Sequence, residues 1–269
     1  MNEGYKKFIE SRLELVDKEG RDVPFRLNKI QDRFLTQDCT GRDIILKARQ
    51  QGFSSLCLAR YTADFILKPN SVNVVVADES ENAESLLDRV KGYIAAYEYQ
   101  TGKKVPLKYN SKSSLVNEMM NSKYTIGTAK NTEFGRSKTI TNLHLSEAAF
   151  YPHFEKLLAG ALQAVTPNGS VVIETTANGY NEFKTFWDDA KRGGNGFNPL
   201  FYKASDFYLP EFLEAKKREL KRLFKQEYPE TDVEAFLTSG DSYFDMQALM
   251  SYMETMKDRM PLEQGIYAL

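Results

Sequence analysis

Apolar residues in the first part of the chain recur at two kinds of spacing, and each spacing predicts a different element. Apolar residues three and four positions apart predict helices over residues 3–19, 26–35, 53–67 and 80–99. Uninterrupted apolar runs predict buried strands at residues 43–46 and 71–77. The chain is therefore expected to begin with two helices and to continue as strand, helix, strand and helix.

The middle of the chain continues this alternation after a stretch of shorter elements. Polar turns separate short strands that are predicted at residues 106–110, 114–119 and 123–128. Beyond them, strands are predicted at 139–145, 170–174 and 200–203, and helices at 152–165 and 181–191. The alternation predicts an α/β fold in which helices flank both faces of a mainly parallel sheet.

The composition changes to charged helices after Pro210, where no strand pattern is found. Helices are predicted over residues 211–228, 232–237 and 245–256. We therefore divide the chain into an α/β core over residues 1–208, which includes the N-terminal helical segment, and a small helical appendage over residues 209–269.

Composition and charge argue against several classes of protein. A net charge of −1 gives no global basic field for nucleic acid, although a local basic patch can suffice for DNA contact. Cys39 and Cys57 lack metal-site spacing and are expected to be reduced thiols of a cytosolic protein, and two histidines are too few for a histidine-based metal site. No apolar stretch is long enough to span a bilayer, and the first residues lack the apolar segment of a signal peptide.

Residues 47–55 read Lys-Ala-Arg-Gln-Gln-Gly-Phe-Ser-Ser and lie between a predicted strand and a predicted helix. A tight loop that ends in Gly-x-Ser at such a place is typical of a phosphate-binding P-loop, because the helix start offers free backbone N–H groups and a positive dipole end. Lys47 stands where the usual pattern has its first glycine, and Phe53 stands where it has its lysine. A strand-to-helix turn with scattered basic residues is the alternative.

The loop carries the groups that a polyphosphate requires. Lys47 and Arg49 supply charge for the β- and γ-phosphates. Gly52 allows a close approach of the backbone, and the Ser54 hydroxyl stands where a P-loop has its Mg²⁺ ligand. The predicted ATP-binding residues of the loop are Lys47, Ala48, Arg49, Gln50, Gln51, Gly52, Phe53, Ser54 and Ser55.

A second motif, Leu143-His-Leu-Ser-Glu147, ends a strand that is expected beside the P-loop strand. In P-loop ATPases such a strand closes with Asp-Glu, in which the Asp organises Mg²⁺ through water and the Glu polarises the attacking water. Glu147 fits the second role, whereas Ser146 stands in the first and can bring only a neutral hydroxyl to the metal. Alternatively, Glu147 is simply a polar residue at the point where the strand leaves the sheet.

A third buried strand is followed by Thr175, Thr176 and Asn178, at the sheet edge where open α/β folds bind ligands. Their hydroxyl and amide groups can sense the γ-phosphate or the attacking water. Asn178-Gly179 can also be no more than a turn.

In this order the three motifs resemble the N-terminal ATPase portion of a tailed-phage large terminase subunit, the DNA-packaging motor protein. The resemblance covers about residues 26–240, with a deviant Walker A sequence at 47–55, a Walker B-like sequence at 143–150 and a coupling motif at 174–179. It implies a P-loop NTPase core of the ASCE type, with the appendage as lid subdomain and linker. It also implies an ATP hydrolase that uses ATP and Mg²⁺ to drive double-stranded DNA into a procapsid.

The same resemblance implies partners and a place of action. The partners are a portal protein, a small terminase subunit and further copies of the chain in a ring on the procapsid, in the host cell cytoplasm and without a membrane. The isolated domain is expected to be monomeric. Full-length large terminases continue into a nuclease domain with a cluster of metal-binding acids, and the final residues of this sequence hold no such cluster. We therefore expect an ATPase domain without nuclease activity.

Two further residues take their roles only from the resemblance. Gln31 matches the adenine-recognising glutamine of the family, and an exposed polar residue on a helix is its alternative. Arg136 matches an arginine that reaches the ATP of the neighbouring subunit in trans. A solvated loop arginine also fits this position, and Lys130 or Arg89 can be confused with it.

Two other functions remain open at this stage. A helicase-like translocase shares the P-loop core but usually carries a second similar core, for which this chain is too short. A non-catalytic DNA-binding or assembly module with a decayed nucleotide site is favoured by the absent lysine at position 53 and the absent aspartate at position 146. Lys47, Arg49 and Glu147 argue against that module.

Overall fold

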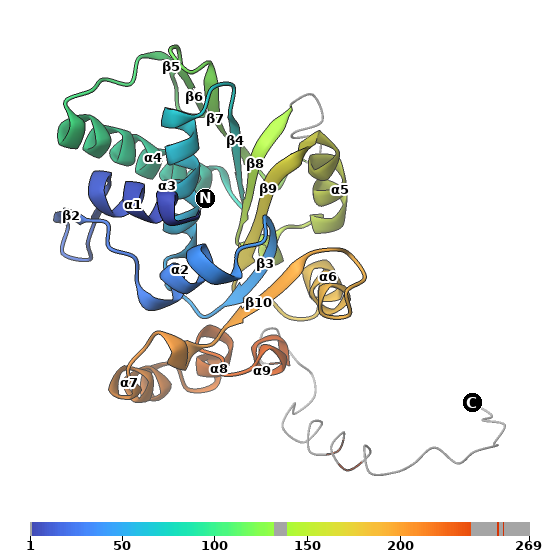
Figure 1. Cartoon of the computed structure of the whole chain (residues 1–269). Helices are drawn as coiled ribbons and strands as arrows, with labels where there is room; N and C mark the ends of the chain where they lie inside the picture. Colours follow the sequence, from blue (N-terminus) through green and yellow to red (C-terminus); the bar gives the residue numbers. More distant parts are fainter. Residues whose placement is uncertain (1, 132–138, 238–251, 253–254, 256–269) are drawn as a thin grey trace.

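Residues 2–131 and 139–237, together with residues 252 and 255, are described by the computed structural model (Figure 1). Arg136 and almost all of the helix predicted over residues 245–256 lie outside the described residues.

An eight-stranded sheet lies at the centre of the described chain. Its strands are β3 (Arg42–Lys47), β4 (Val72–Ala77), β5 (Leu107–Asn110), β6 (Ser114–Asn117), β7 (Ser122–Thr128), β8 (Ile140–Ser146), β9 (Val165–Thr175) and β10 (Asn198–Tyr202). The spatial order is β10-β3-β9-β8-β4-β7-β6-β5. The strands from β10 to β7 are parallel, and β6 and β5 add an antiparallel edge. The predicted α/β fold with a mainly parallel sheet is therefore confirmed.

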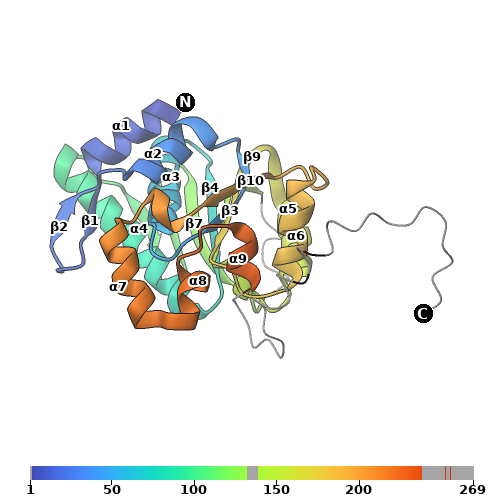
Figure 2. The ribbon, with the colours of Figure 1, turned by 90° about the horizontal axis from the view of Figure 1, so that it is seen from below.

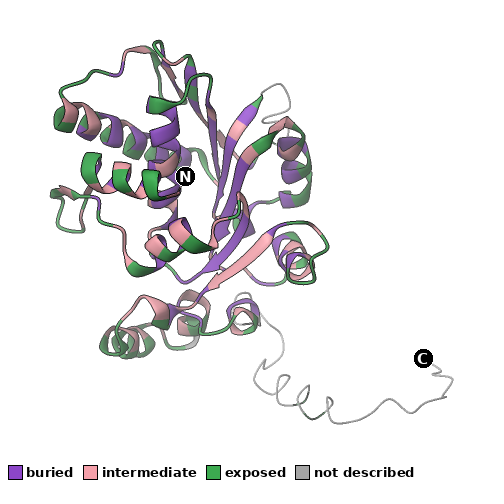
Figure 3. Ribbon diagram, viewed as in Figure 1, coloured by how far each residue is buried: buried purple, intermediate pink, exposed green. Residues whose placement is uncertain are grey.

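Helices cover both faces of this sheet (Figure 1). One face is covered by α1 (Asn2–Arg12), α2 (Lys29–Arg33), α3 (Phe53–Leu67) and α4 (Ser80–Thr101), and the other by α5 (Phe154–Ala164), α6 (Glu182–Lys191) and α9 (Asp232–Leu237). A hydrophobic core lies on each face of the sheet, and β3 contributes to both because side chains alternate along a strand. Ile45 packs with the first group of helices, and Ile44 and Leu46 pack with the second. The central strands are buried on both sides, which explains their uninterrupted apolar runs (Figure 3).

The helix predicted over residues 3–19 is wrong in its second half. After α1 the chain forms an antiparallel hairpin of β1 (Glu14–Val16) and β2 (Asp22–Pro24). Asp17 closes the turn, because its Oδ1 accepts two backbone N–H groups of the same turn, at 2.8 and 2.9 Å. Gly20 completes it with a φ of +77°. Local turn chemistry therefore outweighs the helical spacing here.

The helix predicted over residues 26–35 is shorter than expected and continues differently. α2 is followed by η1 (Phe34–Asp38), a π-helical turn. A capping box starts α2: the Asn28 side chain accepts the Gln31 backbone N–H, and the Gln31 side chain accepts the Asn28 backbone N–H. This arrangement buries Gln31 and fixes its position beside residues 47–55.

Short helices follow β10 and lie over the carboxyl ends of the parallel strands (Figure 2). They are η3 (Ala204–Asp206), α7 (Pro210–Leu220), η4 (Lys221–Leu223), α8 (Phe224–Glu227) and α9. The helix predicted over residues 211–228 is wrong as a continuous element, since Lys221 interrupts it with a φ of +50°. Stacked and edge-to-face contacts join the aromatic rings of Tyr208, Phe212, Phe224 and Tyr228. The domain boundary at residue 209 stays a prediction.

Within the ranges that the structure describes, no helix has the length and apolar character needed to cross a membrane.

Candidate functional site

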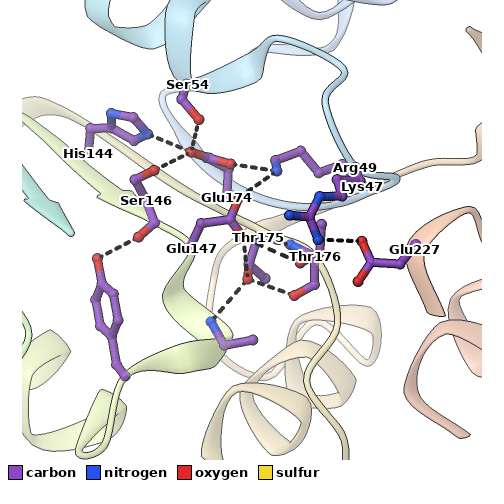
Figure 4. A network of polar contacts seen from close by, with 12 residues as sticks. Lys47, Arg49, Ser54, His144, Ser146, Glu147, Glu174, Thr175, Thr176 and Glu227 are labelled. Atoms are coloured by element: carbon purple, nitrogen blue, oxygen red, sulfur yellow. Dashed lines mark hydrogen bonds and ion pairs between the residues drawn. The ribbon is translucent and has the colours of Figure 1, made fainter. Parts of the chain in front are cut away.

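The carboxyl ends of β3, β9 and β8 lie side by side at one edge of the sheet, next to the start of α3 (Figure 4). The register places Glu174 level with Ile45 on one side and with Ser146 on the other. Ile45 packs on the face that α3 covers. Because side chains alternate with a period of two, Lys47, His144, Ser146 and Glu174 all project onto this face.

Glu174 is the centre of this group and is fully buried. Its Oε1 accepts hydrogen bonds from Ser54 Oγ at 2.7 Å, from Ser146 Oγ at 2.8 Å and from His144 Nε2 at 3.1 Å. A carboxylate can only accept, so we assign the ring proton of His144 to Nε2. Glu174 Oε2 lies 3.1 Å from Lys47 Nζ as an ion pair and accepts no well-directed hydrogen bond from the described residues.

Electrostatics keep both members of this ion pair charged. Burial alone would raise the pKa of Glu174, but the Lys47 charge and the hydrogen-bond donors outweigh it and hold this pKa well below its usual range. Burial alone would lower the pKa of Lys47, but the charges of Glu174 and Glu147 outweigh it and raise this pKa. The site therefore holds a buried ammonium group between two carboxylates.

Glu147 follows β8 directly and faces the same ammonium group. Its backbone adopts a φ of +56°, a left-handed conformation that is uncommon outside glycine, where the short helix η2 (Ala148–Phe150) begins. Its Oε1 accepts from Lys47 Nζ at 3.0 Å, and its Oε2 accepts the backbone N–H of Thr176 at 3.1 Å. The Glu147 side chain is 35% exposed, so it is accessible to a ligand and to water, unlike Glu174.

The loop between β3 and α3 directs unused backbone donors towards this group. Within the described chain, the backbone N–H groups of residues 50–55 donate no hydrogen bond. Gln50 and Gly52 adopt φ values of +57° and +81°, and Gly52 is the N-cap residue of α3. Free N–H groups of such a loop and the positive end of the following helix together form a binding site for an anion.

Gln31 and Asn28 brace the loop from α2. Gln31 Nε2 donates to the Gly52 carbonyl at 2.7 Å, and Asn28 Nδ2 donates to the Gln51 carbonyl at 3.1 Å. There is no room for a side chain at Gly52, because a Cβ there would lie 2.6 Å from Gln31 Nε2. The structure therefore gives Gln31 a supporting role in the loop, and its contact with adenine stays a prediction.

Phe53 belongs to the core and brings no polar side-chain group to the cavity. It is fully buried, and its ring centroid lies 4.7 Å from that of Tyr202 and 5.7 Å from that of Phe34. The position that holds a lysine in an ordinary P-loop therefore offers a ligand only its backbone N–H. The ammonium group comes from Lys47, at the end of β3.

Ala48 and Arg49 connect the loop to the elements that follow β9. The Ala48 N–H donates to the Tyr202 carbonyl at 3.2 Å, and the Arg49 N–H donates to the Glu227 carbonyl at 2.9 Å. The Arg49 guanidinium also pairs with the Glu227 carboxylate at 2.9 Å. These two backbone N–H groups are occupied, and Arg49 shares its charge with α8 in this structure.

A cavity of about 580 Å³ opens between the loop and the end of β8. The predicted residues that line it are Lys47, Arg49, Gln50, Gln51, Gly52, Phe53, Ser54, Ser55, Glu147 and Thr176. Lys18, Asp78 and Phe150 also line it and were not predicted, and Arg89 lines it from α4. The predicted loop residue Ala48 is buried and does not line the cavity.

Two of the three predicted coupling residues lie behind the cavity. Thr175 Oγ1 accepts the Ala149 N–H at 3.1 Å, and Asn178 Nδ2 donates to the Ala149 carbonyl at 3.2 Å. Both side chains therefore hold the turn that follows Glu147, while Thr176 contacts Glu147 itself. Coupling to the γ-phosphate stays a prediction for all three residues, as does the role of Arg136, which lies outside the described residues.

Glu174 and His144 lie within the predicted motifs 174–179 and 143–150, but neither residue had a predicted role of its own. An acidic residue at the end of the apolar run 171–173 was one available signal. The second was the polar pair at alternate positions of β8, His144 and Ser146, which one face of a strand brings together.

The fold is of the P-loop NTPase class. It has the phosphate-binding type of loop after β3 and an acid, Glu147, after β8, and β9 lies between these two strands. No family model matches the sequence, and no curated protein matches it. Among solved structures, the chain is similar to the large terminase ATPase domain of Thermus phage P74-26, with 18% identity and a TM-score of 0.58 over 76% of this chain and 93% of that chain.

Two longer terminases are also similar. The bacteriophage HK97 large terminase is 18% identical with a TM-score of 0.62, over 95% of this chain and 52% of that one. The large terminase of a thermophilic bacteriophage, solved in complex with ATP-gamma-S, is 12% identical with a TM-score of 0.56, over 76% of this chain and 52% of that one. At these identities the likeness shows a shared fold. The predicted resemblance to terminase ATPase domains is confirmed at that level.

Proposed function

We propose that this chain is the ATPase domain of a viral DNA-packaging motor, which couples hydrolysis of Mg-ATP to translocation of double-stranded DNA into a procapsid. The observation that carries the proposal is the position of Lys47. The Lys47 side chain extends from the end of β3 and lines the same cavity as the loop with its free N–H groups. Its ammonium group lies 3.0 Å from Glu147 Oε1. A cation, an anion-binding loop and a carboxylate thus meet at one cavity, which is the set of groups that phosphoryl transfer requires.

The residues around the cavity fit ATP and Mg²⁺. A volume of about 580 Å³ falls within the range of about 300–1,000 Å³ that is usual for small-molecule sites. Free backbone N–H groups and the Lys47 ammonium match the phosphates, and the Ser54 hydroxyl would hold the metal ion. When bound, Mg²⁺ neutralises charge that develops on the phosphate oxygens. Ser146 donates its hydroxyl proton to Glu174 at 2.8 Å, which supports an indirect role at the metal.

Glu147 is the residue that orients and activates the attacking water in this proposal. It is held from two sides, by the Thr176 backbone N–H and by Lys47. Phosphate oxygens would compete for the Lys47 ammonium, which frees Glu147 Oε1 to accept a proton from water. Thr175, Thr176 and Asn178 contact Glu147 or the turn behind it, so a change at this carboxylate would reach that turn through them.

The remaining parts of the motor extend the proposal beyond this chain. Arg136 would act on the ATP of the next subunit in a homo-oligomeric ring around DNA, docked on a portal protein and served by a small terminase subunit in the host cell cytoplasm. The helices α7, α8 and α9 would form the lid. Without the ring, the trans arginine is absent, so the isolated domain is expected to hydrolyse ATP slowly or not at all.

Nucleotide binding and turnover test the proposal. Lys47→Ala should weaken binding of Mg-ATP by about tenfold or more, because a charged hydrogen bond to phosphate is lost. Glu147→Gln should retain binding in the isolated domain, and in the assembled ring it should reduce turnover by about 10²–10⁴-fold. Lys104→Ala is the matched control, since its exposed ion pair with Glu98 lies outside the cavity. A wild-type chain that binds no nucleotide in Mg²⁺ would overturn the proposal in favour of a decayed site.

A further inference from the structure

We propose that Glu174 is the acidic residue that positions the divalent cation of this site, in place of the aspartate that position 146 lacks. The inference rests on the proposed ATPase function and adds a residue to it. It concerns a buried carboxylate that acts on the cation through the Ser54 hydroxyl.

The hydrogen bond from Ser54 is the first argument. Ser54 Oγ donates to Glu174 Oε1 at 2.7 Å. A hydroxyl that gives its proton to a carboxylate keeps its lone pairs for a cation. Mg²⁺ beside ATP needs only one or two protein ligands, because phosphate oxygens and water complete its coordination. Glu174 is therefore hydrogen-bonded to Ser54 Oγ, the oxygen that would bind the ion.

The register of the sheet is the second argument. Ser146 and Glu174 are level on neighbouring parallel strands, and β9 lies between β8 and β3. Glu174 thus presents its charge one strand nearer to the loop than position 146 does. The Ser146 hydroxyl donates to Glu174 at 2.8 Å, so it supports the carboxylate rather than replacing it.

The charge of the group is the third argument. Lys47 lies between Glu147 and Glu174, at 3.0 and 3.1 Å, so two carboxylates share one ammonium group. One ammonium group between two carboxylates leaves one negative charge in this group of three side chains, and a divalent cation at the Ser54 hydroxyl would offset it. Glu174 Oε2 faces Lys47 Nζ at 3.1 Å, so the oxygen that receives the Ser54 proton, Oε1, is the one that would act on the cation.

A purely structural role makes a different prediction. If Glu174 only keeps Lys47 charged and in place, its loss should weaken nucleotide binding equally with and without metal. If it positions the cation, its loss should affect only the metal-dependent part. The informative quantity is the ratio of the ATP-gamma-S dissociation constant in EDTA to that in MnCl₂.

Calorimetric titration of the whole chain measures this ratio. Glu174→Gln should lower the ratio by about 10–100-fold, the usual cost of losing an outer partner of a metal ligand, and should leave the EDTA value within about threefold. Glu98→Gln is the matched control, because it makes the same substitution in an ion pair with Lys104 that lies outside the cavity, and its ratio should stay near wild type. Glu174→Gln combined with Ser146→Asp should regain metal dependence, because it restores a carboxylate at position 146, which is level with position 174 on the neighbouring strand.

Three results would overturn the inference. An unchanged ratio in Glu174→Gln, with affinity equally lost in EDTA and in MnCl₂ or unaltered in both, leaves Glu174 as no more than the counter-ion of Lys47. If Glu174→Gln does not fold, Ser54→Ala removes the hydroxyl through which Glu174 would act, and an unchanged ratio there would also overturn the inference. A wild-type chain that binds ATP-gamma-S in neither condition removes the proposed function itself, and this inference with it.

Discussion

Replacement of Lys47 by methionine would leave the Glu174 carboxylate buried without its counter-ion. The Lys47 side chain is 5% exposed and that of Glu174 is fully buried, and the charged atoms lie 3.1 Å apart. Opposite unit charges at this distance attract by about 5 kcal/mol at an effective dielectric constant of about 20. Loss of one member of a buried pair usually costs about 3–5 kcal/mol, because the other member stays desolvated. We expect Lys47→Met to lower the free energy of unfolding by this amount.

Equilibrium unfolding in urea measures the loss, with circular dichroism and the fluorescence of Trp187, the only tryptophan, as two probes. Lys47→Met combined with Glu174→Gln should regain more than half of the loss, since no uncompensated charge is then buried. Lys130→Met is the control, because its 2.7 Å ion pair with Glu79 is exposed and its loss should cost about 1 kcal/mol or less. Equal losses for the two lysine variants would refute the reasoning.

The pH dependence of stability gives the same test in a second form. In the wild type the pKa of Glu174 is lowered on folding, so its contribution is present above about pH 4.3 and is lost as the pH falls below that value. In Lys47→Met burial is no longer opposed by the ammonium, and the pKa of Glu174 should rise above its unfolded value of about 4.3. The variant should then lose stability as the pH rises from about 5 to 8. Parallel pH profiles for the two proteins would contradict this account.

Three smaller changes test other contacts. Gly52→Ala places a Cβ 2.6 Å from Gln31 Nε2 in left-handed backbone, so thermal unfolding should show a loss of about 1–3 kcal/mol, and an unchanged midpoint would count against the tight fit. Asp232→Ala removes the acceptor 3.0 Å from Trp187 Nε1, so the emission should shift to the red and stability should fall by about 1 kcal/mol, whereas an identical spectrum would argue against this contact. Glu227→Gln should change global stability by about 1 kcal/mol or less and speed amide hydrogen exchange in α7 and α8, and unaltered exchange would show that the carboxylate does not hold these helices.

The elements that the sequence predicted best are those whose pattern is local and strong. The helix predicted over residues 53–67 has the bounds of α3, and the apolar runs at 43–46 and 71–77 lie within one residue of β3 and β4. Strands that are buried on both faces leave little freedom in their residue types, so they are easily recognised.

The predictions that were wrong concern segments in which a turn competes with a helical pattern. Residues 14–19 carry helical spacing, but the Asp17 carboxylate and Gly20 stabilise a hairpin instead. Lys221 divides the helix predicted over 211–228, although no glycine or proline marks the break. Side-chain hydrogen bonds and tertiary packing decide such cases, and spacing alone does not reveal them.

The candidate site divides in the same way. Lys47, Gly52, Ser54 and Glu147 belong to short motifs, and the structure brings all four to one cavity. The position of Glu174 depends on how β9 pairs with β8 and β3, a relation between segments far apart in sequence. No local pattern contains that relation, so Glu174 had no predicted role of its own although it opens the predicted motif 174–179.

The main-chain bonds of the loop have a mechanical consequence. Ala48 is bonded to the end of β10, and Arg49 is bonded to the end of α8. The Arg49–Glu227 ion pair adds a second contact between the same two residues. A displacement of α8 would therefore be transmitted to the loop directly, without passing through the hydrophobic core.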